Sequence, residues 1–395
     1  MKFTIFGGSF DPIHKGHKAI VKAALEQGLA KRIIVMPLGL APHKKRYMSM
    51  ATYRLHMTEL AMSKFPEVQI SDYEIKRTGR YSYTIDTIRH FKEEFANRAK
   101  KVKIVLLYGS DALYTIEDWH KPAEIMREAR LLVAMRGDED IAKAEMRAQE
   151  LRDKYGAKIK LFTMPPHNIS STEIRDKIKR GEDYKKDLPK KVYNFIEQNK
   201  IYAFSDDLAE LTPEERIKLA QLENKVAPLM PRARMIHTLN VMNYAVHLAS
   251  VHGVDRYAAA AAAVLHDCAK YLPIKKQLKY AKKAGSPGVL NQAIAHGPAG
   301  SYYAKRFLGI KDHRILSAVF FHTTARPFMP PLEQIIYLSD KIEFGRGFDD
   351  LDPIRELAEK DLNKAMKLCL SEVEEAFARR NKKIHPMTKA ALTSL

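Results

Sequence analysis

The pattern of short apolar runs changes once along this chain, and that change limits the folds open to it. Up to about residue 200, runs typical of strands alternate with amphipathic stretches typical of helices. The predicted strands are Lys2–Phe6, Arg32–Met36, Val68–Ser71, Lys103–Leu107, Arg130–Met135 and Lys158–Phe162, and the predicted helices are His17–Gln27, Met50–Ser63, Tyr83–Phe95 and Asp138–Lys154. This alternation predicts an α/β fold with a doubly wound parallel sheet, which binds ligands beyond the carboxyl ends of its strands.

Strand signals fade from Thr212 onward, where helical patterns follow one another almost without a break. Thr212-Pro213-Glu214-Glu215 has the capping threonine, first-turn proline and following glutamate of a helix start. We therefore predict an all-α domain after the α/β domain, with residues 202–211 as an acidic linker and domains at 1–203 and 204–395. A chain of 395 residues with 46% hydrophobic residues suits two domains, each with its own core.

Charge and cysteine content restrict the partners. The formal net charge of +20 favours polyanions such as nucleotides, polyphosphates or RNA, although solvated lysines explain it equally well. The lysines are scattered, without an arginine-rich tail or interleaved aromatic residues, so nucleic acid is not expected as the main partner. No apolar run approaches the ~20 residues that span a membrane. The only cysteines, Cys268 and Cys369, form no disulfide framework. We expect a cytoplasmic protein without a membrane partner. The sequence leaves open whether the protein forms a homo-oligomer.

A glycine-rich string, Gly7-Gly8-Ser9-Phe10-Asp11-Pro12-Ile13-His14-Lys15-Gly16-His17, follows the first predicted strand. Its paired glycines remove side chains where the backbone must approach a phosphate or take an unusual conformation. The chain then turns into a helix near Gly16, and a helix N-terminus attracts anions. His14 and His17 are three residues apart, so both can face that first turn. The string predicts a site that binds and transfers a nucleotide phosphate.

A second segment of the same kind is Ile169-Ser170-Ser171-Thr172-Glu173-Ile174-Arg175. Ser170 is placed to cap a helix and Glu173 to complete a capping box. The Arg175 guanidinium beside exposed N–H groups would then form a phosphate clamp. Alone, the segment is better explained as an ordinary capped surface helix; together with the glycine-rich string it predicts the clamp.

The helical half carries six residues of the types that bind metals. They are His237, His266, Asp267, His296, His322 and Asp340. A single histidine on an apolar helix face is usually a hydrogen-bonded core residue, but this set also holds carboxylates. Imidazole and carboxylate suit iron, manganese or zinc. Six ligands exceed the needs of one tetrahedral site, so the set predicts a two-metal hydrolase centre in which Asp267 bridges the ions.

Residues 1–200 resemble the nucleotidyltransferases of the cytidylyltransferase-like superfamily and, more narrowly, bacterial nicotinate mononucleotide adenylyltransferases. The string around His14 and His17 carries the resemblance. Further matching segments are Pro42-His43-Lys44, Ser82-Tyr83-Thr84-Ile85-Asp86-Thr87, Gly109-Ser110-Asp111 with Trp119, and Ile169–Arg175. The resemblance implies a Rossmann-like nucleotidyltransferase fold. It also implies transfer of AMP from ATP to nicotinate mononucleotide, giving deamido-NAD and pyrophosphate, with Mg²⁺ bridging the phosphates.

The same resemblance implies roles for individual residues. The implied catalytic residues of this half are His14, His17, Lys44 and Arg175. The implied ATP-binding residues are Gly7, Gly8, Ser9, Phe10, Asp111, which would contact the ribose, and Ile169, Ser170, Ser171 and Thr172. The implied acceptor-binding residues are His43, Lys44, Thr84 and Trp119. Trp119 would stack on the pyridine ring, although core packing is the alternative for the only tryptophan.

Residues 212–390 resemble the HD-domain phosphohydrolases and, more closely, the bacterial symmetrical diadenosine tetraphosphate hydrolases. The matching stretches are Ala263–Lys270, His296-Gly297, His322-Thr323-Thr324 and Leu338–Glu343, with Ser339 where this branch commonly has alanine. The resemblance implies an HD-type helical domain that cleaves diadenosine tetraphosphate, a dinucleoside polyphosphate, to two ADP. Its cofactor would be two divalent or mixed-valence metals, iron or else manganese, with Asp267 as a catalytic ligand. Lys270, Lys341 and Arg346 would bind substrate phosphates, although surface solubility explains each equally well.

Other functions stay open at this point. The transferase half is also compatible with another acceptor: nicotinamide mononucleotide, phosphopantetheine or glycerol phosphate. The helical half is also compatible with hydrolysis of a guanosine tetraphosphate alarmone or a nucleoside monophosphate. A different class of function makes that half a regulatory module that binds nucleotide or RNA, which the complete set of six ligand-type residues disfavours.

Overall fold

The computed structural model describes residues 2–40, 48–77, 81–97, 102–137, 139–286, 291–346 and 351–395. The chain divides into two compact units, Met1–Ile196 and Glu197–Leu395. This division lies within the helix Lys190–Asn199, seven residues before the domain boundary that we predict after residue 203. The predicted boundary stays a prediction.

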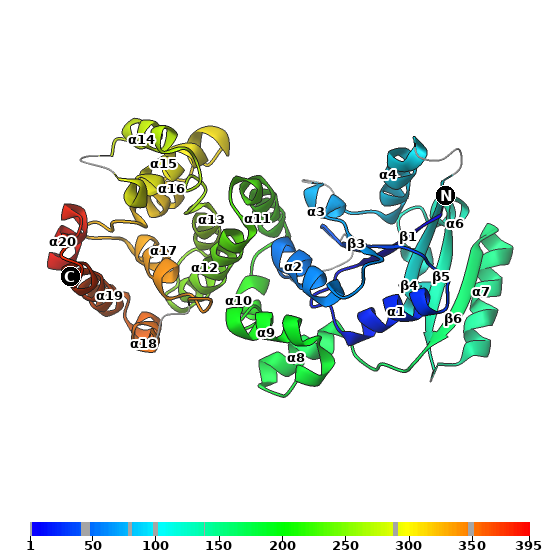
Figure 1. Ribbon diagram of the computed structural model, residues 1–395. Helices are drawn as coiled ribbons and strands as arrows, with labels where there is room; N and C mark the ends of the chain where they lie inside the picture. The colour runs from blue at the N-terminus through cyan, green and yellow to red at the C-terminus, as the bar shows by residue number, and fades with distance from the viewer. Residues whose placement is uncertain are drawn as a thin grey trace. The chain divides into compact units, whose positions relative to one another are not determined.

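The first unit contains a parallel sheet, and in its described residues the strands follow the order β3-β2-β1-β4-β5-β6 (Figure 1). The strands are β1 (Lys2–Gly8), β2 (Ile33–Pro37), β3 (Val68–Ile70), β4 (Lys103–Gly109), β5 (Ala129–Arg136) and β6 (Lys158–Met164). Every neighbouring pair is parallel. The six predicted strands and the α/β class are confirmed, because strands buried on both faces are recognisable as short apolar runs.

α-Helices connect and follow these strands. They are α1 (Lys15–Glu26), α2 (Ala51–Met62), α3 (Tyr73–Lys76), α4 (Thr84–Ala96), α5 (Asp111–Thr115), α6 (Pro122–Glu128), α7 (Ile141–Tyr155), α8 (Ser171–Arg180) and α9 (Lys190–Asn199). A buried apolar cluster joins one face of the sheet to α4, α5, α6 and α7. Helices α1 and α2 contribute nothing to that cluster and contact β6 and β2, so they cover the opposite face.

Strand β1 lies at the point where the strand order reverses, and this position places the first site. It pairs with β2 on one side and with β4 on the other. The connections after β1 and after β4 therefore leave the sheet in opposite directions and open a crevice at the carboxyl ends of these two strands. Gly7 and Gly8 end β1, and Gly109 ends β4, so both predicted glycine segments lie at this crevice.

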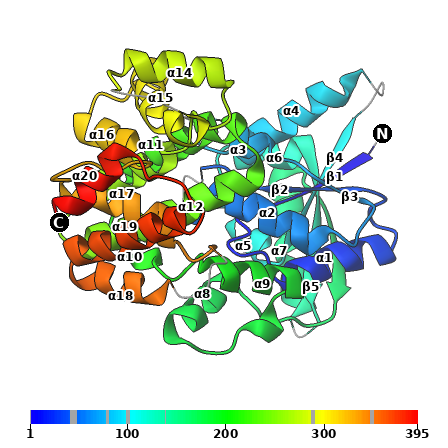
Figure 2. The same cartoon turned by 60° about the vertical axis from the view of Figure 1, so that its left-hand side comes forward.

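The described part of the second unit is helical and contains no strand. Its helices are α10 (Ser205–Ala209), α11 (Pro213–Val226), α12 (Arg232–Val251), α13 (Arg256–Leu265), α14 (Ile274–Lys283), α15 (Gln292–Phe307), α16 (His313–Phe321), α17 (Pro331–Ile342), α18 (Asp352–Lys360), α19 (Leu362–Ala378) and α20 (Pro386–Thr393). The predicted start of α11 is confirmed: Thr212 N donates to Glu215 at 2.8 Å, and Glu215 N donates to Thr212 Oγ1 at 3.2 Å. Figure 2 shows α17, α18 and α19 side by side, in agreement with their contacts.

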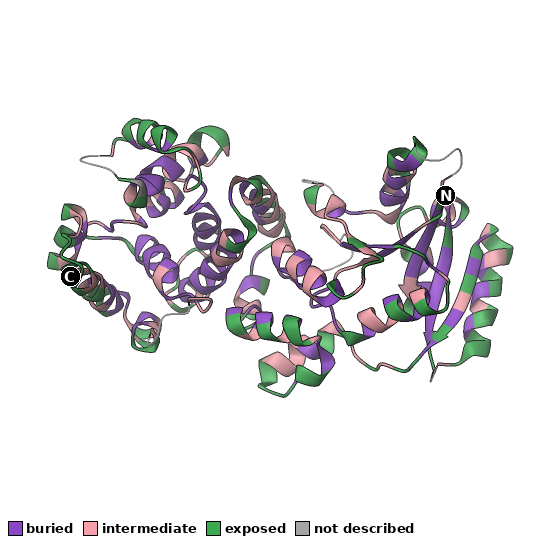
Figure 3. Cartoon of the chain, in the orientation of Figure 1, coloured by how far each residue is buried: buried purple, intermediate pink, exposed green. Residues whose placement is uncertain are grey.

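Helices α12 and α13 form the centre of the second unit. All eight residues from Ala258 to Leu265 are buried, and most of them are alanine, whose small side chain lets other helices approach closely. Helix α12 packs against α13 and α17, and α13 also packs against α16. Figure 3 shows α12 and α13 as mainly buried. This packing directs the ends of α12, α13, α16 and α17 toward one another.

Residues 202–211, predicted as an acidic linker, belong to the second compact unit. Tyr202, Leu208 and Leu211 are buried, and α10 lies within the segment and packs against α12. Asp207, whose charge suggested a solvated linker, lies 2.8 Å from His247 Nδ1. The acidic stretch is therefore part of the fold of the second unit.

None of the helices in the described residues is both long and apolar enough to cross a lipid bilayer.

Candidate active sites

A cavity of about 550 Å³ lies at the crevice between β1 and β4. It is lined by twelve of the residues that the sequence assigned to this half. They are Gly7, Gly8, Ser9, Phe10, His14, His17, Thr84, Asp111, Trp119, Ile169, Ser170 and Ser171. His43 and Lys44 lie outside the described residues, and Thr172 and Arg175 lie beside the cavity without lining it. The predicted transferase residues thus meet at one place, while their individual roles stay predictions.

The two histidines of the glycine-rich string stack at the start of α1. Their ring centroids are 3.7 Å apart, and His14 N donates to His17 Nδ1 at 3.2 Å. His17 thus occupies the third position of the helix and accepts from the capping residue. Phe10 is fully buried against His17, and its ring leaves no room for a side chain at position 8, where an added Cβ would lie 2.7 Å away. Gly8 is thus required by close packing of the loop itself.

His14 is held neutral by its surroundings. Burial and, to a smaller extent, the Arg136 guanidinium lower the pKa of its imidazole from 6.5 to about 4. The buried His14 Nδ1 has no hydrogen-bond partner among the described residues. A neutral imidazole can donate one hydrogen bond to a phosphate oxygen, and a bound anion would favour its protonated form.

We expect His14 to make folding less favourable in mild acid. Its pKa is lower in the folded protein than the 6.5 of an unfolded chain, so the unfolded state binds more protons between these values. The free energy of unfolding should therefore fall as the pH falls from about 6.5 to 4, by up to about 3 kcal/mol from this group. Urea unfolding at several pH values, compared between the wild type and His14→Asn, measures the difference. An identical pH dependence in both proteins would contradict the low pKa.

Helix α8 is joined to the glycine-rich string by direct bonds. Ser170 caps it by accepting from Glu173 N at 3.1 Å, as predicted, whereas the Glu173 carboxylate pairs with Lys177 at 3.3 Å. Ser171 Oγ donates to Pro12 O at 3.0 Å, and Arg175 donates to Asp11 O. The N-termini of α1 and α8, each with unpaired N–H groups, therefore border the same cavity.

The far side of the cavity is lined by Thr84, Tyr108 and Trp119. The Tyr108 and Trp119 rings meet edge to face at 5.2 Å, and Tyr108 hydrogen-bonds to Thr84. Trp119 packs partly on the core cluster while it lines the cavity, so it has both of the environments considered from the sequence. This side has room for a flat ring that contacts an aromatic side chain.

The further lining residues, to which the sequence analysis gave no role, include Glu74, His120, Arg136 and His167. Arg136 ends β5, at the same edge of the sheet as Gly8 and Gly109, and its effect on the pKa of His14 places a positive charge beside that imidazole. The rule that parallel strands present their carboxyl ends to the ligand would have identified Arg136. Glu74 is buried and accepts from Thr87 Oγ1 at 2.6 Å, a contact that no local motif signals.

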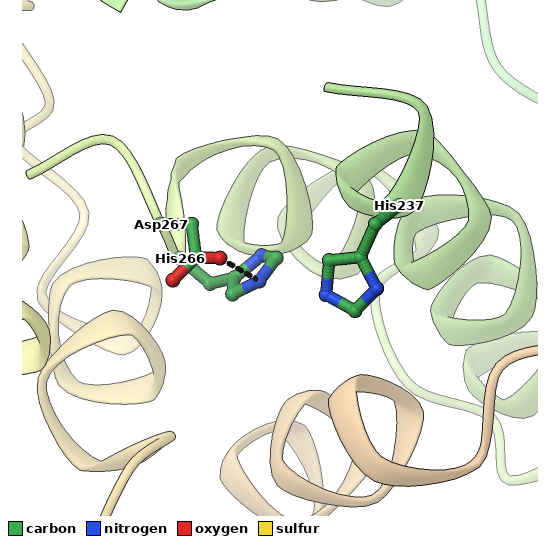
Figure 4. A group of neighbouring side chains, drawn as sticks. All are labelled: His237, His266 and Asp267. Atoms are coloured by element: carbon green, nitrogen blue, oxygen red, sulfur yellow. Dashed lines mark ion pairs between the residues drawn. The ribbon is translucent and has the colours of Figure 1, made fainter. Parts of the chain in front are cut away.

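The six predicted metal ligands of the second unit lie together. Two groups have ligand atoms within 4.8 Å of one another: His237 with His266 and Asp267, and Asp267 with His296 and His322. Asp267 belongs to both groups, as its predicted bridging role requires. Asp340, the sixth residue, has its Oδ1 3.0 Å from His237 Nε2 and 3.7 Å from His266 Nε2. Figure 4 shows His237 reaching from α12 toward His266 and Asp267, which follow α13.

The histidine rings are turned so that Nε2 faces the centre. His266 Nδ1 lies 2.6 Å from Ala263 O, and His322 Nδ1 lies 2.7 Å from Val319 O. A carbonyl oxygen only accepts, so these Nδ1 atoms carry the proton and Nε2 keeps its lone pair. His296 Nε2 lies 3.2 Å from Asp267 Oδ1 and 3.3 Å from His322 Nε2. Nitrogen lone pairs and carboxylate oxygens that converge in this way need a cation between them.

The burial and hydrogen bonding of these six side chains also suit bound metal ions. His266 Nε2 and Asp267 Oδ1 are buried without a well-formed hydrogen bond to the described residues. Burial lowers the pKa of His296 and His322 and favours the neutral ring that binds metals. The set suits a pair of divalent ions bound by nitrogen and oxygen.

Four cationic side chains surround the two ligand carboxylates. Lys270 Nζ lies 3.3 Å from Asp267, Lys341 Nζ lies 2.6 Å from Asp340, and Arg346 Nη2 lies 2.9 Å from Asp340. Arg234, which the sequence analysis missed, also pairs with Asp267. An arginine in an amphipathic helix resembles an ordinary surface residue, so no sequence signal marked it. Metal ions that neutralise these carboxylates would leave the four cations available to phosphates.

Comparisons with known proteins match both halves of the chain. Residues 5–177 match the cytidylyltransferase-like family, and residues 234–345 match the HD domain family. A protein of Mycoplasma pneumoniae, named "Probable nicotinate-nucleotide adenylyltransferase/Ap4A hydrolase", is 29% identical over 93% of this chain and 98% of its own length. A Clostridium tetani protein, named "Probable nicotinate-nucleotide adenylyltransferase", is 36% identical over 51% of this chain and 98% of its own length.

A solved structure from Clostridium acetobutylicum, described as a predicted HD superfamily hydrolase involved in NAD metabolism, is 35% identical. It covers 44% of this chain and 94% of its own, with a TM-score of 0.43.

The fold and the two sites together define a cytidylyltransferase-like nucleotidyltransferase joined to an HD-domain hydrolase. Within that class, the chain belongs to the family of nicotinate-nucleotide adenylyltransferases that carry a C-terminal HD domain.

Proposed function

We propose that the chain carries two activities. The first unit transfers AMP from ATP to nicotinate mononucleotide, giving deamido-NAD and pyrophosphate. The second unit hydrolyses diadenosine tetraphosphate, a compound of the kind named for its Mycoplasma relatives, to two ADP. The observation that carries the proposal is the separate convergence of two residue sets, twelve of the predicted transferase residues around the cavity at β1 and the predicted metal ligands around Asp267.

The transferase reaction needs no covalent protein nucleophile. A phosphate oxygen of nicotinate mononucleotide attacks the α-phosphorus of ATP, a new P–O bond forms, and the bond to the leaving pyrophosphate breaks. His14 and His17 are placed to donate hydrogen bonds to phosphate oxygens and to stabilise the charge on the leaving group. Arg175 positions the start of α8 through its bond to Asp11 O, and Thr84 and Trp119 form the side that would hold the pyridine ring. Mg²⁺ supplies charge neutralisation on the polyphosphate when bound.

The hydrolase reaction depends on ions that the second unit is built to hold. His237, His266, Asp267, His296, His322 and Asp340 would hold two ions, for which we propose iron or manganese. Such ions supply Lewis-acid activation of water and of the phosphate. Lys270, Lys341, Arg346 and Arg234 would bind the tetraphosphate, so that the attacked phosphorus lies over the centre. The cytoplasmic location expected from the sequence is part of this proposal.

A product assay tests both activities on the intact protein. The protein receives ATP, nicotinate mononucleotide and Mg²⁺ in one reaction, and diadenosine tetraphosphate with Fe²⁺ or Mn²⁺ in another. We expect deamido-NAD from the first and ADP as the only nucleotide product from the second. Nicotinamide mononucleotide or phosphopantetheine accepted in preference to nicotinate mononucleotide would contradict the first assignment, and formation of AMP and ATP would contradict the second.

Arg136→Ala should impair the transferase alone. Arg136 at the end of β5 lines the same cavity as His14, where its guanidinium can bind a phosphate oxygen. We expect a 10–100-fold higher KM for ATP, the loss of about 1–3 kcal/mol from a hydrogen bond to a charged group. Arg130→Ala is a matched control, because Arg130 lies near the amino end of the same strand, away from its carboxyl end, and is not among the residues that line the cavity. Equal effects of the two substitutions would exclude a substrate contact for Arg136.

A further inference from the structure

One histidine of the metal site differs from its neighbours in the group behind it. His266 and His322 direct Nδ1 at backbone carbonyls, whereas His237 Nδ1 lies 3.0 Å from Glu343 Oε1. The Glu343 side chain is only 2% exposed. His237 is thus held between two carboxylates, Glu343 behind it and Asp340 in front of it at 3.0 Å.

The turn after α17 is built to present this carboxylate. Gly345 N donates to Glu343 Oε2, and an added Cβ at Gly345 would lie 2.4 Å from Asn240 Nδ2. Arg355 donates through Nε to Ile342 O at 2.8 Å and through Nη2 to Glu343 O at 3.3 Å. These bonds fix the backbone on both sides of Glu343, so its side chain has little freedom to leave His237.

A carboxylate behind an imidazole changes the imidazole as a ligand. It keeps the proton on Nδ1, fixes the plane of the ring and raises the basicity of Nε2. It also places a negative charge close to the ion that Nε2 would bind. The position shared by His237 and His266 therefore faces two carboxylates, Asp267 and Asp340, and has Glu343 behind His237, while the position between His296 and His322 faces Asp267.

We propose that Glu343 is a positioning residue that makes the two metal positions unequal. It acts through His237 and gives the position beside His237 the higher affinity for a divalent ion. The position between His296 and His322 is then the weaker and more exchangeable of the two. This inference rests on the proposed two-metal centre and adds an order of binding to it.

Titration of the metal-free protein with Mn²⁺, followed by calorimetry, tests this order. We expect two binding events in the wild type, and in Glu343→Gln a 10–100-fold weaker tight event with the weak event unchanged. In a His237→Ala background, Glu343→Gln should have no further effect, because its action passes through that ring. Glu359→Gln is the matched control: Glu359 lies 3.0 Å from His247 Nε2, another histidine–carboxylate pair outside the metal set, and should leave both affinities unchanged.

The possible results separate the two ideas. Two unchanged Mn²⁺ affinities in Glu343→Gln would overturn the role of Glu343 and leave the metal centre in place. Two results would overturn the claim that Glu343 acts through His237. One is equal weakening of both Mn²⁺ binding events in Glu343→Gln, and the other is an undiminished effect of Glu343→Gln in the His237→Ala background. A wild type that binds no Mn²⁺ would overturn the two-metal centre together with this inference. Glu343 accepts from two donors, Gly345 N and His237 Nδ1, whereas the amide of a glutamine has a single acceptor oxygen. The unfolding temperatures of all variants therefore show whether the turn at Gly345 has lost its structure.

Discussion

Asp267→Asn should abolish hydrolysis of diadenosine tetraphosphate and leave deamido-NAD synthesis intact. Asp267 is fully buried and is the residue shared by both ligand groups. Asparagine keeps the size of the side chain and removes its charge and one of its two acceptor oxygens. We expect the hydrolysis rate to fall at least roughly 10³-fold, about 4 kcal/mol of barrier, together with loss of bound metal measured by elemental analysis.

The control for this substitution is Asp255→Asn. Asp255 caps α13, the helix that leads to His266, by accepting from Ala258 N at 2.9 Å, and asparagine is an equally good cap. We expect full hydrolysis in this variant. Retained hydrolysis and metal content in Asp267→Asn would show that the six residues do not form the catalytic centre, and loss of deamido-NAD synthesis in the same variant would show that the two sites are not independent.

Much of the fold could be predicted from the sequence, because the strands are buried and therefore stand out as continuous apolar runs. The run Ile33–Pro37 is entirely buried, so its apolar character is continuous and its limits are sharp. The linker could not be predicted in the same way. The acidic residues of the segment suggested a linker, but Tyr202, Leu208 and Leu211 beside them are buried, and Asp207 pairs with His247 from α12. A charged residue whose partner is 40 positions away gives no local signal.

The site residues show the same contrast between features with a local sequence signal and features without one. His14, His17 and the six metal ligands were found because each belongs to a short string or a set of one chemical type. Arg136, Arg234 and Glu343 were missed because their roles arise from neighbours that the fold supplies: the end of β5, the Asp267 carboxylate and the His237 ring. A long basic or acidic side chain on a helix or at a strand end is normally solvated. Only the packing of α12 against α17 makes Glu343 part of a site.

His17→Ala should abolish deamido-NAD synthesis and leave hydrolysis of diadenosine tetraphosphate unchanged. The imidazole lines the cavity at the start of α1, beside His14. Loss of one such donor to the transition-state charge costs about 10²–10³ in kcat. The substitution also removes the acceptor for His14 N, so part of any loss could come from a frayed helix, worth about 1 kcal/mol.

His17→Gln separates these two effects, because glutamine at the third helical position supplies an oxygen for the capping bond but no imidazole. If the imidazole acts on the phosphates, His17→Gln regains the unfolding temperature of the wild type while its kcat stays as low as that of His17→Ala. His90→Ala, which removes a histidine stacked on Tyr73 outside the cavity lining, should keep full activity. Recovery of kcat in His17→Gln would mean that His17 only orders the start of α1. The charge on the leaving pyrophosphate would then have to be met by His14 and Arg136, which also line the cavity.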